Sequence, residues 1–163
     1  MSGESGILVL GVGNVLMGDE GVGVEAVRTL GARGVPAGVE IVDGGTGGFH
    51  LLEYLESGRR VILIDAALDG AAPGTVRVVR PRFARDLPPN LSAHDIGLKQ
   101  LLDAAALLGK APEVRLVTVS VAALPEGLAL DLSAPVRAAL PEVLRRVDEL
   151  IAELRELELR ESP

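Results

Sequence analysis

Apolar residues occur along the chain in two patterns, short uninterrupted runs and longer stretches with helical spacing. The runs at 61–64 and 116–119 contain a single polar residue, which predicts central parallel strands buried on both faces. The segment 75–80 follows Pro73 and Gly74 with no helix between, so it should pair antiparallel as an edge strand. The predicted strands are Ile7–Gly11, Val39–Asp43, Arg60–Asp65, Thr75–Arg80 and Val114–Val121.

Stretches with helical spacing separate these runs and complete a continuous α/β alternation. The last stretch carries one apolar stripe from Val136 to Leu157, and Pro141 should either kink that helix or begin a new one. No repeat or long linker is visible, so we expect one open α/β domain over residues 1–163, rimmed by the Pro- and Arg-rich loop Pro81–Leu91. The predicted helices are Glu20–Arg33, Gly48–Ser57, His94–Leu108 and Ala134–Arg160.

Composition limits the kinds of partner that this chain can have. The 163 residues carry a formal net charge of −7, which argues against nucleic acid and against an anionic membrane surface. No apolar run nears the roughly 18 residues of a membrane span, and the lack of cysteine fits a reducing cytoplasm. We therefore expect a cytoplasmic protein, and an aromatic content of 2% favours a monomer without a large permanent interface.

Residues Ile7–Gly21 carry the densest chemical signal: an apolar run, a glycine turn and two adjacent carboxylates before an amphipathic helix. This order predicts the first strand, turn and helix of the domain. A dinucleotide site would need a third glycine at Leu16, and a P-loop would need Gly-Lys-Ser/Thr in place of Gly18-Asp19-Glu20. Asp19 and Glu20 would also repel a phosphate at the helix N-terminus. We interpret the turn as half of a metal-binding site.

Asp65 and His94 are the candidates for the other half. Asp65 ends the most apolar strand, at the edge where open α/β sheets bind ligands. If the first and third strands are neighbours, their ends lie about 5 Å apart, so Glu20 and Asp65 could share one ion. His94 follows the predicted N-cap Ser92, and the positive end of the helix disfavours its cationic form, as metal binding requires. Two carboxylates and one imidazole suit Zn or Ni, bound weakly and exchangeably.

Each of these features has a plainer alternative. Asp65 taken alone could be a turn-forming residue, since Asp favours turns. His94 taken alone could be a surface residue near a helix cap. The segment Asp43–Gly48 is either a plain turn with an N-cap or a glycine-rich bed for an extended peptide. His50 is interpreted as an ordinary helix-surface residue outside the site. The joint placement of Glu20, Asp65 and His94 at one sheet edge is what favours metal binding.

Four blocks of sequence together resemble the hydrogenase maturation endopeptidases of nickel–iron hydrogenases. They occur in the order of that family with similar spacing, and the match covers nearly the whole chain. Ala93 departs from the pattern, since some members carry proline before the histidine, but the ligand itself is unchanged. The blocks are G-V-G-N-V-L-M-G-D-E-G-V-G at 11–23, D-G-G-T-G-G at 43–48, I-D-A at 64–66 and S-A-H-D-I-G-L at 92–98.

The resemblance implies a three-layer, doubly wound α/β fold with a mostly parallel five-stranded sheet and one antiparallel edge strand. It implies that Glu20, Asp65 and His94 bind nickel that the substrate supplies, as a recognition handle and not as a stored cofactor. Zn or another divalent ion fits the same three ligands. The implied reaction removes a C-terminal extension from the large-subunit precursor of a nickel–iron hydrogenase after nickel insertion.

The cleavage step is defined less closely by the sequence. Asp43 matches a motif Asp that is linked to activity in the family, and it is the candidate catalytic residue. The scissile bond would lie over Asp43-Gly44-Gly45, with Gly44, Gly45 and Thr46 contacting the substrate, while the metal or a carboxylate polarises the carbonyl or activates water. Neither a G-x-S-x-G nor an H-E-x-x-H motif is present. Three alternatives stay open: a non-catalytic chaperone that senses the metal centre, a nucleotide-binding enzyme, and an unrelated hydrolase on this fold.

Overall fold

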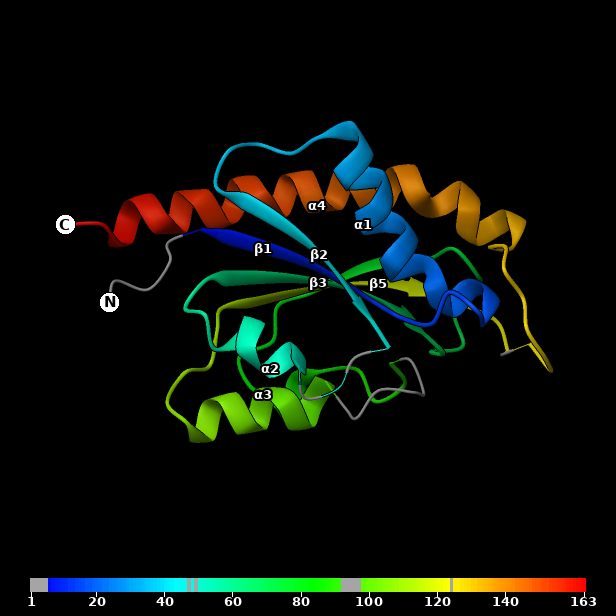
Figure 1. Ribbon diagram of the computed structural model, residues 1–163, viewed down its shortest axis with the longest axis horizontal. Helices are drawn as coiled ribbons and strands as arrows, with labels where there is room; N and C mark the ends of the chain where they lie inside the picture. The colour runs from blue at the N-terminus through cyan, green and yellow to red at the C-terminus, as the bar shows by residue number, and fades with distance from the viewer. Residues whose placement is uncertain (1–5, 47, 49, 92–97, 124) are drawn as a thin grey trace.

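One sheet forms the centre of the computed structural model, which describes residues 6–46, 48, 50–91, 98–123 and 125–163. The strand order is β2-β1-β3-β5-β4 (Figure 1). β1 pairs parallel with β2 and with β3, and β3 pairs parallel with β5. β4 pairs antiparallel with β5 at the edge. The strands are β1 (Ile7–Val12), β2 (Val39–Gly45), β3 (Arg60–Ala67), β4 (Val76–Val79) and β5 (Val114–Ser120).

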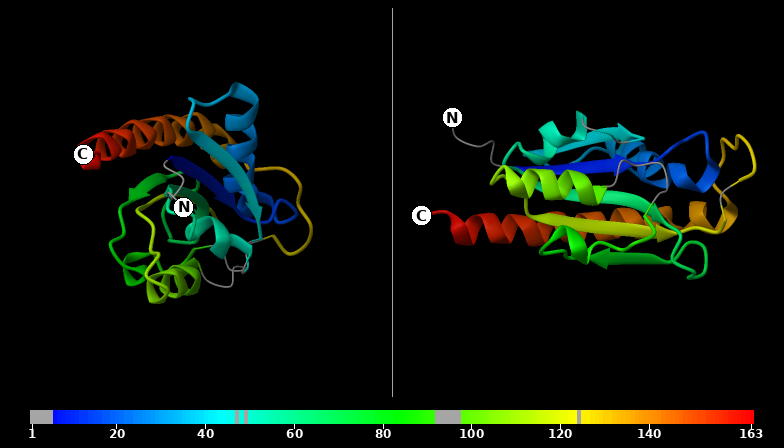
Figure 2. Two further views of the ribbon diagram at one scale, coloured as in Figure 1. Left: turned by 60° about the vertical axis from the view of Figure 1, so that its left-hand side comes forward. Right: turned by 90° about the horizontal axis from the view of Figure 1, so that it is seen from below.

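Helices cover both faces of the sheet and complete three layers. α1 and α4 lie on one face, and α2 and α3 lie on the other (Figures 1 and 2). No helix within the described ranges is both long enough and apolar enough to cross a lipid bilayer. The helices are α1 (Val22–Arg33), α2 (His50–Leu55), α3 (Leu98–Leu107) and α4 (Ala134–Glu161), with the short 3-10 helices η1 (Gly18–Gly21) and η2 (Ala84–Asp86).

Alternate residues of the central strands belong to two separate apolar cores, as the two-residue period of a strand requires. Ile62 and Ile64 of β3 join the core beneath α1 and α4, whereas Val61 and Leu63 join the core beneath α2 and α3. All four side chains are buried, which confirms the prediction of a strand covered on both faces. By the same alternation, Asp65 lies on the α2 and α3 side of the sheet.

The predicted fold class and the strand neighbours that matter for the site are confirmed. β1 lies between β2 and β3, with Gly11 opposite Asp43 on one side and opposite Ile64 on the other. The first and third strands are therefore adjacent, as the proposed metal site requires. The predicted antiparallel edge strand is β4. Each strand runs within two residues of its predicted bounds.

The helices differ from their predicted bounds in two instructive ways. α2 is shorter than the predicted helix over 48–57, because Gly48 has a φ of +107° and Gly58 a φ of +82°, both outside the helical region. α4 continues as one helix through Pro141, so no new helix begins there. Its apolar face packs along the sheet, which outweighs the hydrogen bond that Pro141 does not donate. The predicted start of α3 at 94 lies outside the described residues.

Candidate metal-binding site

Glycines let the first helix approach the ends of two strands closely. A Cβ atom on Gly23 would lie 2.3 Å from the carbonyl oxygen of Ile64 and 2.4 Å from that of Val12. A Cβ atom on Gly13 would lie 1.9 Å from the carbonyl oxygen of Glu20. These distances exclude any side chain at either position, so main chain packs directly on main chain. The glycine turn therefore brings η1, with Glu20, to the carboxyl end of β3, and packing alone accounts for these glycines.

Glu20 and Asp65 are both buried at this edge of the sheet. Glu20 lies in η1 and is 1% exposed, and Asp65 lies in β3 and is 0% exposed. η1 packs against β3, so the two carboxylates come from adjoining elements. Oδ1 of Asp65 accepts a hydrogen bond from the N–H of Ala66 at 2.8 Å. Buried carboxylates in proteins are paired, hydrogen-bonded or bound to a metal, and this placement suits two ligands of one ion.

The third predicted ligand, His94, lies outside the described residues. Among the residues that the structure does describe, no three His, Cys, Asp or Glu side chains form a group that could hold a metal ion. Glu20 and Asp65 are therefore brought to one edge as predicted, and the position of the histidine stays a prediction. The other histidine, His50, is exposed at the start of α2, as expected of a helix-surface residue.

Asp43, the candidate catalytic residue, faces a different layer from Asp65. It lies in β2 opposite Gly11, so β1 separates it from β3. One carboxylate oxygen is 3.5 Å from a guanidinium nitrogen of Arg28 in α1, and Oδ1 accepts the N–H of Gly45 at 2.9 Å. This contact places the Asp43 side chain on the α1 face, whereas Asp65 belongs to the α2 face. The Asp43 side chain is 44% exposed and thus open to solvent.

The predicted substrate-contacting residues follow Asp43 at an irregularity in the pairing of β1 with β2. Gly44 is the extra residue of this bulge and is buried. Gly45 has a φ of +54°, and its carbonyl oxygen accepts the N–H of Gly13 at 2.7 Å. Because the N–H of Gly45 donates to Asp43, both main-chain polar groups of Gly45 are hydrogen-bonded within the protein. Thr46, the next residue, is exposed.

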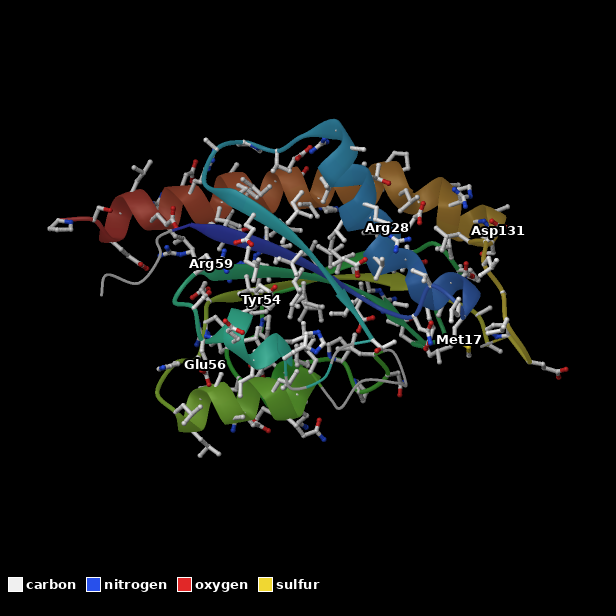
Figure 3. The ribbon with its side chains drawn as sticks, in the orientation of Figure 1. Met17, Arg28, Tyr54, Glu56, Arg59 and Asp131 are labelled. Carbon is white, nitrogen blue, oxygen red and sulfur yellow. The ribbon has the colours of Figure 1, made fainter. Side chains whose placement is uncertain are left out.

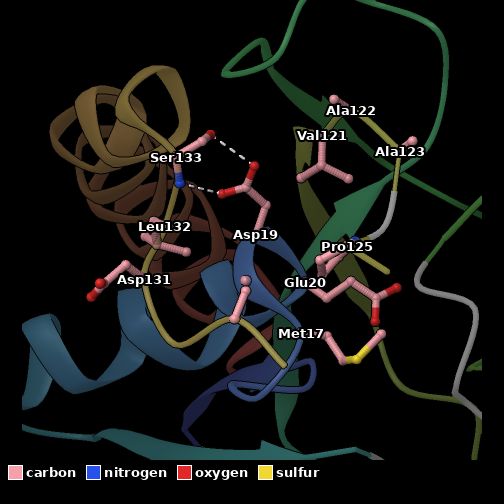
Figure 4. A pocket seen from close by; sticks show the side chains of 12 residues that line it. Met17, Asp19, Glu20, Val121, Ala122, Ala123, Pro125, Asp131, Leu132 and Ser133 are labelled. Atoms are coloured by element: carbon pink, nitrogen blue, oxygen red, sulfur yellow. Dashed lines mark hydrogen bonds between the residues drawn. The ribbon is translucent and has the colours of Figure 1, made fainter. Parts of the chain in front are cut away.

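A contact outside the predicted site joins η1 to the start of α4. Oδ1 of Asp19 accepts the main-chain N–H of Ser133 at 2.7 Å, and Oδ2 accepts the Ser133 hydroxyl at 2.8 Å (Figure 4). Ser133 is the N-cap residue of α4. The carboxylate of Asp19 thus accepts hydrogen bonds at the beginning of α4, a contact that the sequence analysis did not predict. This contact fixes the residue next to Glu20.

A cavity of about 230 Å³ opens beside Glu20 (Figure 4). Met17 and Glu20 line one side, and residues that follow β5 line the other. The two sides are joined by main-chain hydrogen bonds at Ala129, whose N–H donates to Leu16 at 2.9 Å and whose carbonyl oxygen accepts the N–H of Gly18 at 2.7 Å. This pairing was not predicted. The alternation of leucine with other residues over 126–132 is the signal that could have indicated an extended segment there.

Asp69 is a further carboxylate beyond the end of β3, and it serves the structure. Partial burial opposes its ionisation, but hydrogen bonds from the Ala71 N–H and the Ser120 hydroxyl, with the charge of Arg77, outweigh that effect and lower its pKa. The Ser120 hydroxyl donates at 3.1 Å and the Arg77 guanidinium lies at 3.3 Å. These partners engage both carboxylate oxygens in holding the strand ends. We therefore leave Asp69 out of the candidate site.

Solved structures define the class of protein to which this fold belongs. The hydrogenase maturating endopeptidase HybD from Escherichia coli superimposes with a TM-score of 0.77 at 37% sequence identity, covering 93% of each chain. A nickel–iron hydrogenase maturation protease HybD from Thermococcus kodakarensis has a TM-score of 0.69 at 28% identity, covering 90% of this chain and 99% of that one. The architecture is therefore that of the maturation endopeptidases.

Sequence comparison identifies the family. The model of the hydrogenase maturation protease family matches residues 24–149. The hydrogenase 2 maturation protease of Escherichia coli K12 is 38% identical over 152 residues, which cover 88% of this chain and 91% of that protein. The hydrogenase expression/formation protein HupD of Bradyrhizobium diazoefficiens is 44% identical over 117 residues, which cover 69% of this chain and 60% of that longer protein. The chain belongs to the hydrogenase maturation protease family, and it is a peptidase.

Proposed function

We propose that this maturation endopeptidase removes a C-terminal extension from the large-subunit precursor of a nickel–iron hydrogenase, and that it recognises nickel already bound in that precursor. Glu20, Asp65 and His94 are the proposed nickel ligands. The observation that carries the proposal is the burial of Glu20 and Asp65, from adjoining elements, at one end of the sheet. The nickel is part of the substrate, so the enzyme has to bind it weakly enough to release the product.

The proposed reaction is hydrolysis of one peptide bond. Water adds to the carbonyl carbon, the carbon–nitrogen bond breaks, and the proton from water goes to the leaving nitrogen, which yields a new carboxyl end and a free peptide. Asp43 is the proposed catalytic carboxylate, because it is half-exposed at the same end of the sheet and can reach a substrate without unfolding. Its ion pair with Arg28 and its hydrogen bond from Gly45 would hold the carboxylate in one orientation.

Gly44, Gly45 and Thr46 remain the proposed substrate-contacting residues, with distinct contributions. Gly44 keeps the bulge narrow, and Gly45 supplies a positive φ. Thr46 is the exposed residue of the three and would contact the peptide through its side chain. The monomeric state and the cytoplasmic location expected from the composition also belong to this proposal.

Isosteric removal of the buried charges tests the proposal. We expect Glu20→Gln and Asp65→Asn each to lower the rate of precursor processing at least about tenfold, the usual cost of damaging a metal contact. Processing is followed as the mass loss of the nickel-loaded precursor. Glu156→Gln is the matched control, since it removes the same charge from an exposed position on α4. Undiminished processing by Glu20→Gln and Asp65→Asn would remove both residues from the mechanism.

A further inference from the structure

Exposed leucines gather at the end of the molecule that carries Glu20. Among the described residues, few large apolar side chains are highly exposed. Three of these lie in the turn before η1 and in the segment that pairs with that turn. Leu16 is 47% exposed, Leu128 is 78% exposed and Leu130 is 76% exposed. We call these three residues the leucine rim. Contiguous exposed apolar side chains on a globular protein commonly mark a binding surface.

The leucine rim is held in place by main-chain contacts. Ala129, between Leu128 and Leu130, donates to the Leu16 carbonyl oxygen and accepts from the Gly18 N–H. The same segment is fixed again four residues later, where Ser133 donates twice to Asp19. The leucines are thus presented on an ordered backbone, which lowers the entropy lost when a partner binds.

The rim is continuous with the candidate metal site. Met17, Glu20 and Ala129 line one cavity, and the leucines flank Met17 and Ala129 in the chain. Figure 3 shows Met17 and Asp131 at the same end of the molecule, with Glu56 and Arg59 toward the opposite end. Figure 2 shows η1 and the segment before α4 together from a second direction. A partner that brings a metal centre to Glu20 has to cover this surface.

Charge selects the kind of partner that fits. Glu126 and Asp131 are exposed and lie on either side of Leu128 and Leu130 in the chain. The protein as a whole carries a net charge of −7. A second copy of this chain would bring like charges together around the same leucines, which is unfavourable. An apolar patch bordered by basic side chains on a different protein would be complementary.

We propose that the leucine rim is the docking surface for the hydrogenase large-subunit precursor, and that an apolar patch with basic neighbours on the precursor covers it. This inference rests on the proposed function, because it takes the same precursor as the partner. The rim binds the folded body of the precursor, while Glu20 and Asp65 meet its metal. Affinity for the precursor then depends on side chains that take no part in the cleavage step.

Matched double variants test the docking surface. Leu128→Ser with Leu130→Ser changes the rim, and Leu107→Ser with Leu159→Ser is the control at the opposite end, where the exposed fractions are 89% and 77%. The dissociation constant of the nickel-loaded precursor from the organism that encodes this chain is measured by biolayer interferometry, together with kcat/KM for processing. We expect the rim variant to raise Kd and lower kcat/KM at least about tenfold, as loss of central apolar contacts does, and the control to match the unmodified protein.

The outcomes separate the two proposals. If the unmodified protein cleaves the precursor and the rim variant binds and cleaves it equally well, the docking surface is refuted and the proposed function stands. If the unmodified protein neither binds nor cleaves the precursor, the proposed function fails. Sedimentation equilibrium of both proteins gives their oligomeric states. If the unmodified protein is a dimer and the rim variant is a monomer, the rim forms contacts between copies of this chain and the inference is overturned.

Discussion

Asp19 and Ser133 are 114 positions apart in the chain, and the carboxylate of one accepts both the main-chain N–H and the hydroxyl of the other, at 2.7 and 2.8 Å. The pair ties the 3-10 helix that carries Glu20 to the first turn of the longest helix. Hydrogen bonds to an ionised acceptor are shorter and stronger than those between neutral groups. This contact therefore ties the element that carries Glu20 to the beginning of α4.

We expect Asp19→Ala to lower the free energy of unfolding by about 1.5–3 kcal/mol, because both hydrogen bonds to the charged group are lost. Ser133→Ala should cost about 1 kcal/mol, since it removes the hydroxyl and keeps the N–H. Chemical denaturation of both variants and of the double variant measures the coupling. If the two costs simply add in the double variant, the pair does not act as a unit.

Two glycines in α1 should respond in opposite ways to alanine. Gly23→Ala places a methyl group within 2.4 Å of two carbonyl oxygens and should cost about 3 kcal/mol or more. Gly31→Ala meets nothing within 4 Å and should stabilise the protein by about 0.5–1 kcal/mol, because alanine favours a helix. Thermal melting of the two variants provides the comparison. A stable Gly23→Ala protein would show that the helix can move away from the sheet.

The role of Asp43 can be separated from that of its ion pair. Asp43→Asn removes the carboxylate charge and should lower the rate of precursor processing at least about a hundredfold, in line with loss of a general base. Arg28→Ala keeps the carboxylate and removes a half-exposed partner at 3.5 Å, so it should change the rate by less than about threefold. Single-turnover cleavage followed by mass spectrometry gives both rates. Equal losses in the two variants would point to the ion pair and not to the acid.

Pro141 lies inside α4 at an exposed position and withholds one hydrogen bond from the helix. Pro141→Ala should restore that bond and raise the free energy of unfolding by about 2 kcal/mol, after allowance for the greater freedom of the unfolded chain. Urea denaturation provides the measurement. A loss of stability would mean that the proline shapes the helix to the sheet in a way that alanine does not reproduce.

Glu153 links α4 to the edge of the sheet and should give stability a dependence on pH. The hydrogen bond from Arg80 and then that from Arg115 hold the pKa of Glu153 below its ordinary value of 4.5. Its folded pKa is depressed, so its contribution is complete above pH 4.5 and is lost as the pH falls through the folded pKa. The stability difference between the unmodified protein and Glu153→Gln should be constant near neutrality and shrink below about pH 4.5. Denaturation curves at several pH values test this, and a difference that persists into acid would contradict it.

The class of fold could be predicted because its signals are local. The apolar runs of β3 and β5 indicated a sheet covered on both faces, and the carboxylate after the run at 61–64 indicated the edge at which we propose the site. The bounds of α2 differ from those predicted. Gly48 and Gly58 shorten α2 through positive φ values, and the composition of the segment does not reveal which glycine adopts one.

The surroundings of the site depend on contacts between residues far apart in the chain, which no periodicity encodes. The hydrogen bonds of Asp19 to Ser133 and of Ala129 to Leu16 are of this kind. The glycine turn was predicted, but the close packing of Gly13 on Glu20, and of Gly23 in α1 on Val12 and the end of β3, became evident only in three dimensions. The alternation of leucines over 126–132 is compatible with an extended segment, but it does not encode which part of the chain that segment pairs with.

The segment beside Met17 is anchored through atoms that every amino acid except proline possesses, because Ala129 uses its own N–H and carbonyl oxygen. Residues 128 and 130 can therefore be exchanged without loosening that anchor. Natural variation could redirect such an enzyme to another precursor by altering two positions, while the chemistry of cleavage is inherited intact. Selectivity and turnover would then evolve on separate parts of the same surface.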